Sequence, residues 1–272
     1  PPGFNSQINP GDMPNVKKIT FSDYSQFDKE IIAETFPELT EITFGKDFNS
    51  QIHPGAMPNV KEIEFGFEFN QPILEGTFPK LKKITFGDQF NQPINPGAMP
   101  KVTEIDFSKG YMFNKPILEG TFKELEEITF GFNFNSQIVP GAMPKVKKIK
   151  FEYYSEFNQP ILEGTFPELE EIYFGDNFNS KIQPGAMPKV SAIFFRKGSE
   201  FDQEIVEGTF PELRTIEFTR GYLQNYDIQY DQYNQFSSST KKIKTGGFRK
   251  LSKKTKNRRY KKSKISKISK KK

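Results

Sequence analysis

The side chains of this 272-residue chain that could carry out acid–base chemistry are two pairs of adjacent glutamates, Glu126–Glu127 and Glu170–Glu171, and one histidine, His53. A general acid and a general base must both reach the substrate. The glutamate pairs lie in segments with strand alternation, where adjacent side chains point to opposite faces, so solvated charges explain them better. The chain has no cysteine, and one histidine cannot form a ligand cluster. The sequence therefore predicts no catalytic residue, no metal site, no cofactor and no enzymatic activity.

The segments that carry these side chains form a tandem array. A Phe-Asn motif, with Phe-Asp in two copies, recurs ten times at steps of only 21 or 23 residues. Repeats of this length are solenoid units with about one strand per turn, and they bury their apolar face by stacking on one another. His53 occupies a slot that holds Asn, Val or Gln in related repeats, which argues against catalysis. The motif phenylalanines are Phe4, Phe27, Phe48, Phe69, Phe90, Phe113, Phe134, Phe157, Phe178 and Phe201.

Each repeat contains one short strand. In Val60-x-x-Ile63-x-Phe65, apolar and polar residues alternate at the end, which is the pattern of a strand with one buried face. All ten repeats carry Ile and then Phe at the last two apolar positions, so we expect one parallel sheet. Pro-Gly and Met-Pro dipeptides, such as Pro96–Gly97 and Met99–Pro100, forbid a long helix and predict turns or short 3₁₀ pieces on the other side.

The asparagine after each motif phenylalanine is the most informative polar position. It lies beside aromatic residues that we expect to be buried, and its amide offers donors and an acceptor to the turn backbone. A buried amide without partners would cost about 1 to 3 kcal/mol, so we interpret the position as a structural ladder rather than a binding site. Its members are Asn5, Asn49, Asn70, Asn91, Asn114, Asn135, Asn158 and Asn179, with Asp28 and Asp202 as departures.

The sequence Phe-Asn-Gln-Pro-Ile at residues 69–73, 90–94 and 157–161, followed by proline and a Leu/Val-x-x-Ile-x-Phe-Gly strand, resembles the FNIP repeat. The resemblance covers about residues 4–218. It implies a variant of the leucine-rich repeat that is frequent in social amoebae and in giant viruses that infect them. Several members carry an F-box, which implies arrays that present substrates to a ubiquitin ligase. The expected fold is thus a β-rich, leucine-rich-repeat-like curved solenoid with one short parallel strand per 21–23-residue repeat.

Two surfaces are candidates for partner binding. On the open face of the sheet the charges vary between repeats, and Tyr173 and Phe194, with Ala192, form the least polar patch. Along one rim, four repeats carry two extra residues after the strand. Exposed tyrosine is typical of interface anchors, although neutral insertion in tolerant turns is the alternative. The tyrosines of these longer turns are Tyr24, Tyr111, Tyr153 and Tyr154.

The net charge of +5 conceals an asymmetry. Residues 241–272 contain 17 Lys or Arg and no acid, whereas residues 1–240 contain 22 basic and 34 acidic residues. The tail has too few apolar residues to fold alone, so we expect it to be disordered. It could bind nucleic acid or another polyanion, direct nuclear import, or keep the chain soluble and fold back on the acidic body. The polyanion-binding candidates are Lys253, Lys254, Lys256, Arg258, Arg259, Lys261 and Lys262.

The sequence predicts three parts: ten repeats in residues 1–218, a polar cap from a decayed eleventh repeat in residues 219–240, and the basic tail in residues 241–272. No apolar run approaches the roughly 20 residues that span a bilayer. We find neither a secretory signal nor an Asn-x-Ser/Thr acceptor, and expect a cytoplasmic or nuclear protein. The leading hypothesis is a monomeric, non-enzymatic scaffold that binds a protein partner. The alternative is nucleic acid or polyanion binding by the tail, with the repeats as a spacer.

Overall fold

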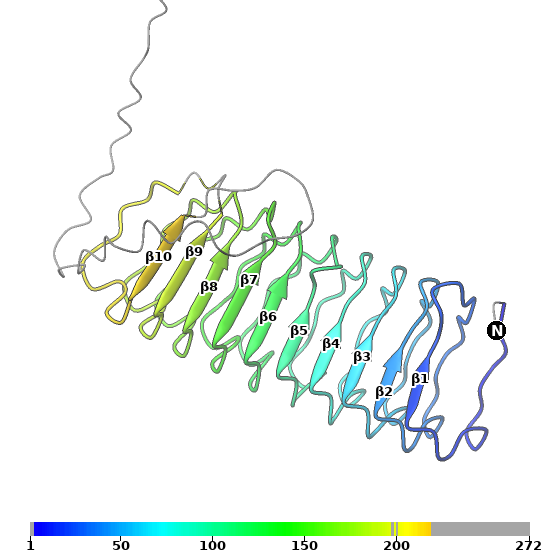
Figure 1. The fold of residues 1–272 in the computed structure, drawn as a ribbon. Helices are drawn as coiled ribbons and strands as arrows, with labels where there is room; N and C mark the ends of the chain where they lie inside the picture. The colour runs from blue at the N-terminus through cyan, green and yellow to red at the C-terminus, as the bar shows by residue number, and fades with distance from the viewer. Residues whose placement is uncertain (1–2, 197–198, 200, 219–272) are drawn as a thin grey trace, which may run out of the picture.

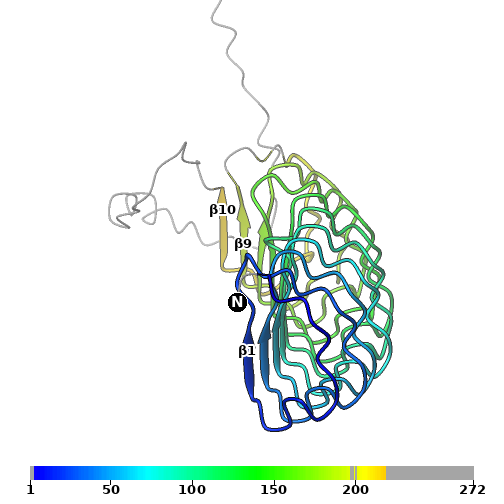
Figure 2. The same cartoon turned by 90° about the vertical axis from the view of Figure 1, so that its right-hand side faces the viewer.

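The structure is a computed structural model, and it describes residues 3–196, 199 and 201–218. Ten short strands in this part of the chain form one sheet in sequence order (Figure 1). The turns lie behind the sheet, so that each repeat makes one coil of a solenoid (Figure 2). The strands are β1 (Lys18–Thr20), β2 (Glu41–Thr43), β3 (Glu62–Glu64), β4 (Lys83–Thr85), β5 (Glu104–Asp106), β6 (Glu127–Phe130), β7 (Lys148–Phe151), β8 (Glu171–Phe174), β9 (Ala192–Phe195) and β10 (Thr215–Phe218).

Every strand pairs in parallel with the next one, and the register places equivalent residues opposite each other. Ile42 of β2, for example, lies between Ile19 of β1 and Ile63 of β3. The isoleucines of β2 to β9 are buried, while the residues beside them face solvent at least in part. This alternation is what a strand with one buried face requires. The expected parallel solenoid of the leucine-rich-repeat type is confirmed, and the described residues contain no helix.

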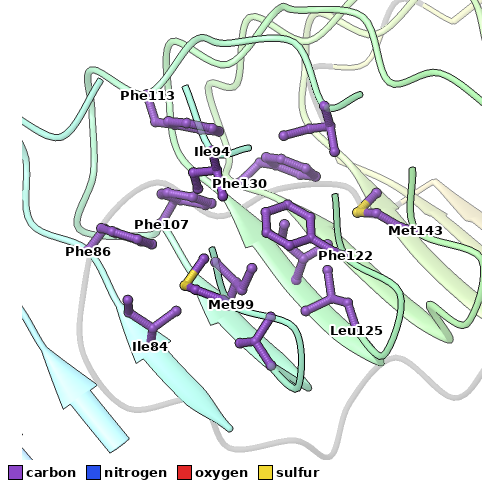
Figure 3. Packing of buried hydrophobic residues seen from close by; sticks show 14 of the residues in the cluster. Ile84, Phe86, Ile94, Met99, Phe107, Phe113, Phe122, Leu125, Phe130 and Met143 are labelled. Carbon is purple, nitrogen blue, oxygen red and sulfur yellow. The ribbon is translucent and has the colours of Figure 1, made fainter. Parts of the chain in front are cut away.

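The core contains two continuous columns of stacked phenylalanine rings. One column is formed by the Phe that follows the strand isoleucine, and the other by the motif Phe. The Phe65 ring lies 3.7 Å from that of Phe69 in the other column, and 5.3 and 5.8 Å from those of Phe44 and Phe86 in its own. Figure 3 shows Phe86 and Phe107 as nearly parallel neighbours. Offset stacking of this kind adds about 0.5 to 1.5 kcal/mol per pair to the hydrophobic burial.

A third core column alternates between methionine and phenylalanine, and it divides the repeats into two kinds. We call repeats one, three, five, seven and nine M repeats, and the even-numbered repeats F repeats. The next core column alternates in step, with Val in M repeats and Leu in F repeats, so each layer with larger side chains packs between layers with smaller ones. The alternating residues are Met13, Phe36, Met57, Phe78, Met99, Phe122, Met143, Phe166, Met187 and Phe210.

On the turn side, opposite the strands, backbone hydrogen bonds also join neighbouring repeats at three junctions where an F repeat precedes an M repeat. Between repeats two and three, Ile31 N–H donates to Gln51 O at 3.0 Å, His53 N–H donates to Ile31 O at 2.9 Å, and Phe36 N–H donates to Ala56 O at 3.0 Å. Equivalent bonds join repeats six to seven and eight to nine. The side predicted as turns or 3₁₀ pieces is thus built of turns and isolated parallel bridges.

Glycines form a further column where the short rim turns follow the strands. A Cβ atom on Gly66 would lie 2.0 Å from Gly45 O, and one on Gly87 would lie 1.8 Å from Gly66 O. Real Cβ atoms do not approach a carbonyl oxygen this closely. Successive backbones touch at these residues, so glycine is required here for contact rather than for an unusual backbone angle.

Candidate interaction surfaces

The motif asparagines form a continuous hydrogen-bonded ladder along one edge of the array. The side-chain Oδ1 of each accepts from the backbone N–H of the equivalent residue one repeat later. Asn49 Oδ1 accepts from Asn70 N–H at 2.8 Å, and Asn91 Oδ1 accepts from Asn114 N–H at 3.0 Å. The same bond recurs at all nine steps from Asn5 to Asp202, through Asp28, Asn49, Asn70, Asn91, Asn114, Asn135, Asn158 and Asn179.

The ladder lies at the surface and is not buried. Most of its members are half-buried, and the exposed ones are Asn5, Asn114, Asn158 and Asp202. The hydrogen bond that repeats along the ladder depends on the acceptor oxygen of the side chain, and an aspartate also supplies this oxygen. Asp28 Oδ1 accepts from Asn49 N–H at 2.9 Å and from Ser50 Oγ at 2.7 Å.

Two substitutions of Asn91 test whether the position needs only the acceptor oxygen or the whole side-chain amide. We expect Asn91→Asp to change the free energy of unfolding by less than about 0.5 kcal/mol, because a carboxylate oxygen accepts the same bond. Asn91→Ala leaves Asn114 N–H without this acceptor and should cost about 1 kcal/mol. Urea unfolding of the two variants beside the parent chain makes the comparison. Equal losses for Asp and Ala would mean that the acceptor oxygen is not what the position needs.

The strand face, meaning the side chains of the sheet that point to solvent, is polar along β1 to β6. Lys18 Nζ lies 2.6 Å from Glu41 Oε2, and Lys83 Nζ lies 2.6 Å from Glu104 Oε1. The hydrogen bond with Glu104 raises the pKa of Lys83 above its ordinary value. These pairs are solvent-exposed, so each contributes little to stability.

An aromatic pair interrupts this polar face at its C-terminal end. The rings of Tyr173 on β8 and Phe194 on β9 stack with centroids 4.4 Å apart and planes 10° apart. Lys148 and Lys150 Nζ lie 5.8 and 6.0 Å from the Tyr173 ring centroid, and the Tyr173 hydroxyl donates to Glu171. Both rings are half-buried. The two residues that sequence reasoning selected on this face are thus in direct contact.

The four rim tyrosines lie on the same edge but do not form one cluster. Tyr153 and Tyr154 are neighbours, with ring centroids 6.3 Å apart, and Tyr111 lies 6.3 Å from Phe132. Tyr24 follows β1 whereas Tyr111 follows β5, which separates them by roughly 19 Å at four strand spacings. All four are exposed.

Sequence reasoning missed several residues of these surfaces. Arg196 reaches back two repeats and places its guanidinium 3.8 Å from the centroid of the Tyr153 ring. Phe67 and Phe132 occupy the rim position after the conserved glycine, and Phe67 is 48% exposed. An aromatic residue at a turn position that is otherwise polar was a usable signal. Ile32, Leu74 and Leu118 are also exposed, on the turn side of F repeats.

Two shallow hollows open on the same side of the array. The first lies on the strand face over β1 to β4, between residues such as Lys18, Glu62 and Thr85. The second lies on the rim, where the short turns of repeats two to four stand between the longer turns that carry Asp23 and Lys109. Lys109 Nζ lies 2.6 Å from Glu64 Oε1, and the hydrogen bond with Glu64 raises the pKa of Lys109.

The acidic pairs and the histidine make contacts between repeats. Glu126 lies 3.2 Å from Lys147, Glu171 lies 3.4 Å from Lys148, and His53 Nε2 lies 3.3 Å from Glu30 Oε2. Among the described residues, no group of three or more His, Cys, Asp or Glu side chains could hold a metal ion. No helix in that part of the chain is long and apolar enough to cross a membrane.

The expected cap in residues 219–240 and the tail with its seven basic candidates lie outside the described residues.

Comparison with solved structures relates the fold to known solenoids. Seven chains match. One is CroV588, from a giant virus, whose structure is described as a novel circular LRR protein structure, where LRR denotes the leucine-rich repeat. The TM-score is 0.62 at 29% sequence identity, over 79% of this chain and 35% of that one. This chain therefore spans about a third of the length of CroV588. None of the curated proteins matches the chain.

The repeats themselves match a known family model. The model of the FNIP repeat fits residues 4–68, 69–110 and 157–197, which together are more than half of the chain. Solenoids of this kind expose long surfaces that suit protein interaction. The resemblance drawn from Phe-Asn-Gln-Pro-Ile is therefore confirmed, and the chain belongs to the FNIP repeat family.

Proposed function

We propose that this chain is a non-enzymatic scaffold that binds a protein partner through the strand face of repeats seven to nine. The observation that carries the proposal is the stacked pair of Tyr173 and Phe194. Strands β1 to β6 carry only Thr, Glu or Asp at the equivalent position. Aromatic side chains among charged neighbours have the composition of interface hot spots.

The chemistry around the pair suggests what the partner offers. Lys150 forms no ion pair within the described residues, and its ammonium lies beside the Tyr173 ring. On the adjoining rim, Tyr153 is covered by the Arg196 guanidinium. A partner segment with an apolar side chain for the ring pair and a carboxylate for Lys150 would complement this patch.

Exchange of the aromatic pair tests the proposal. Threonine is the residue at this position in β1, β2, β4 and β6, so Tyr173→Thr with Phe194→Thr replaces the pair by side chains that the array already uses. We expect the double variant to lose at least about tenfold in partner affinity, because removing hot-spot aromatics costs 2 kcal/mol or more, roughly. Quantitative affinity capture followed by titration of the captured protein measures this loss.

The matched control changes residues at the equivalent position of the strand face, but near its N-terminal end. Thr43→Ala with Thr85→Ala alters β2 and β4 and should leave binding unchanged. Urea unfolding of both double variants checks that the array still folds. If the Tyr173 and Phe194 exchange binds the partner as tightly as the parent chain, the patch is not the recognition surface.

The basic tail supports a second candidate function. Its 17 basic residues and lack of acids suit phosphate backbones. Capture with residues 1–272 and 1–240 in parallel, with nuclease and at raised salt, separates the two candidates. Capture that needs the tail and disappears with salt or nuclease favours polyanion binding, with the repeats as a spacer. If subunits of a ubiquitin ligase are captured together with the partner, this result would support a further role, in which the array presents the bound protein to the ligase.

A further inference from the structure

The turn side carries a row of aliphatic side chains that recurs in every second repeat. Leu74 is 41% exposed, Leu118 is 49% exposed, and Leu162 is half-buried. M repeats mostly place a polar residue at this position, as in Asn95, so the core does not require an aliphatic side chain here. Exposed apolar side chains that recur in this way mark a surface for interaction. The members of the row, all from F repeats, are Ile32, Leu74, Leu118, Leu162 and Val206.

A carboxylate accompanies three of these leucines in the same place each time. Glu75, Glu119 and Glu163 directly follow the leucines and are exposed. Each lies across the turn glycine of the next M repeat, since a Cβ on Gly97 would lie 3.2 Å from Glu75 Cγ and one on Gly141 would lie 3.0 Å from Glu119 Cγ. Within the described residues, none of the three carboxylates forms an ion pair. The row thus carries uncompensated negative charge at regular intervals.

Leucines and carboxylates alternate along the turn side. Each leucine belongs to an F repeat and its carboxylate lies over the next M repeat, so each carboxylate stands about halfway between two leucines. At the spacing of parallel strands, two repeats cover about 9.6 Å and one repeat about 4.8 Å. A complementary partner must therefore offer an apolar group about every 10 Å with a cation about halfway between. Because the carboxylates lie midway, this requirement is the same in both directions along the array.

An α-helix is the regular structure that meets both requirements on one face. Seven helical residues rise about 10.5 Å and return the side chain to the same face, and a residue three or four positions later also lies on that face. In an extended strand, every third residue spans a similar distance but points alternately to opposite sides. The helix and the array differ by only about 2 Å over two periods.

We propose that the turn side of repeats four to nine binds an amphipathic helix of a protein partner. The helix carries an apolar residue at every seventh position and a lysine or arginine three or four positions after each. Leu74, Leu118 and Leu162 contact the apolar residues, and the glutamates that follow them pair with the cations. The strand face lies on the other side of the coil (Figure 2), so this partner is additional to the one that the strand face binds.

Two synthetic peptides of about 25 residues test the spacing on the full chain. Both are alanine-based and contain the same leucines and lysines, but leucine recurs at every seventh residue in one and at every eleventh in the other. The longer spacing also keeps the leucines on one helix face, but about 16.5 Å apart. Fluorescence anisotropy should give a dissociation constant at least about tenfold lower for the seven-residue spacing. Equal affinities, or no binding of either peptide, would overturn the proposal.

Substitution of the leucines tests where the seven-residue peptide binds. Leu74→Asn with Leu118→Asn introduces the residue that the array already uses at Asn95, and it should weaken binding at least about tenfold. Met112→Asn is the matched control, because Met112 is 40% exposed on the rim, and its binding should equal that of the parent chain. Urea unfolding checks that both variants fold. Undiminished binding by the leucine variant would show that the row is not the site.

The carboxylates and the strand face provide two further comparisons. Glu75→Gln with Glu119→Gln should weaken the seven-residue peptide severalfold at low salt and little at high salt, because exposed ion pairs are screened. Equal losses at both salt concentrations, or none, would contradict the pairing with cations. Tyr173→Thr with Phe194→Thr should bind this peptide as tightly as the parent chain does. A loss there would place the peptide on the strand face and overturn the assignment to the turn side.

Discussion

Phe90→Ala is expected to lower the free energy of unfolding by about 3 to 5 kcal/mol. The Phe90 ring is fully buried, and its centroid lies 4.1 Å from that of Phe86 and 6.0 Å from those of Phe69 and Phe113. Alanine would leave a cavity at the point where both ring columns pass from repeat four to repeat five. Because a solenoid is stabilised only by contacts between neighbours, one weakened layer divides the array into two blocks.

Urea unfolding followed by circular dichroism measures the decrease in the free energy of unfolding. Hydrogen exchange shows which repeats are destabilised. We expect exchange to rise first in repeats four to six. Phe67→Ala is the matched control, because Phe67 lies on the rim of repeat three and is 48% exposed. Its cost should stay within about 0.5 kcal/mol. Similar losses for the two variants would contradict the view that the stacked columns hold the array together.

Gly66→Ala is expected to destabilise the chain by about 3 kcal/mol or more, at the upper end of the usual cost of overpacking. The added Cβ would lie 2.0 Å from Gly45 O, 2.5 Å from Gly45 C and 2.7 Å from Lys46 Cα. All three are backbone atoms, so no side chain can rotate to relieve the contact. Repeats two and three must move apart, which weakens both phenylalanine columns beside them.

A glycine of the other kind provides the control for this variant. Gly76 has φ +76° on the turn side, and a Cβ there would have no heavy atom within 4 Å. Gly76→Ala should therefore cost only the strain of a left-handed residue, about 1 to 2 kcal/mol. Thermal and urea unfolding of the two variants would compare them directly. A smaller loss for Gly66→Ala than for Gly76→Ala would show that the backbones can separate easily.

The repeat spacing and the Ile-x-Phe pattern were sufficient to predict the fold. They set one short strand in each repeat, and identical spacing leaves a parallel sheet as the simple way to bury every isoleucine. The pattern could not give the direction of the asparagine bonds. Whether the amide of Asn70 donates or its oxygen accepts depends on which backbone group of the next repeat faces it, and that is a property of the assembled array.

Contacts between residues two repeats apart could also not be predicted from the sequence. Arg196 meets Tyr153 from two repeats away, and Lys109 meets Glu64 over the same interval. Both contacts depend on how far the longer rim turns project over their shorter neighbours. Turn length was visible in the sequence, but the path of the turn was not. The contact between the two aromatic residues of the strand face could be predicted from the sequence, because the strand register alone brings Tyr173 beside Phe194.

The alternation of M and F repeats has a consequence for how such an array can change during evolution. Deleting one repeat would bring two F repeats or two M repeats into contact, so that two large layers or two small layers meet in the core. Deleting or duplicating two adjacent repeats preserves every layer contact. The unit that can be duplicated or deleted without disturbing the core is therefore a pair of adjacent repeats. Unequal recombination can lengthen or shorten the array in steps of two repeats, and each step copies or removes two adjacent strands of the strand face together.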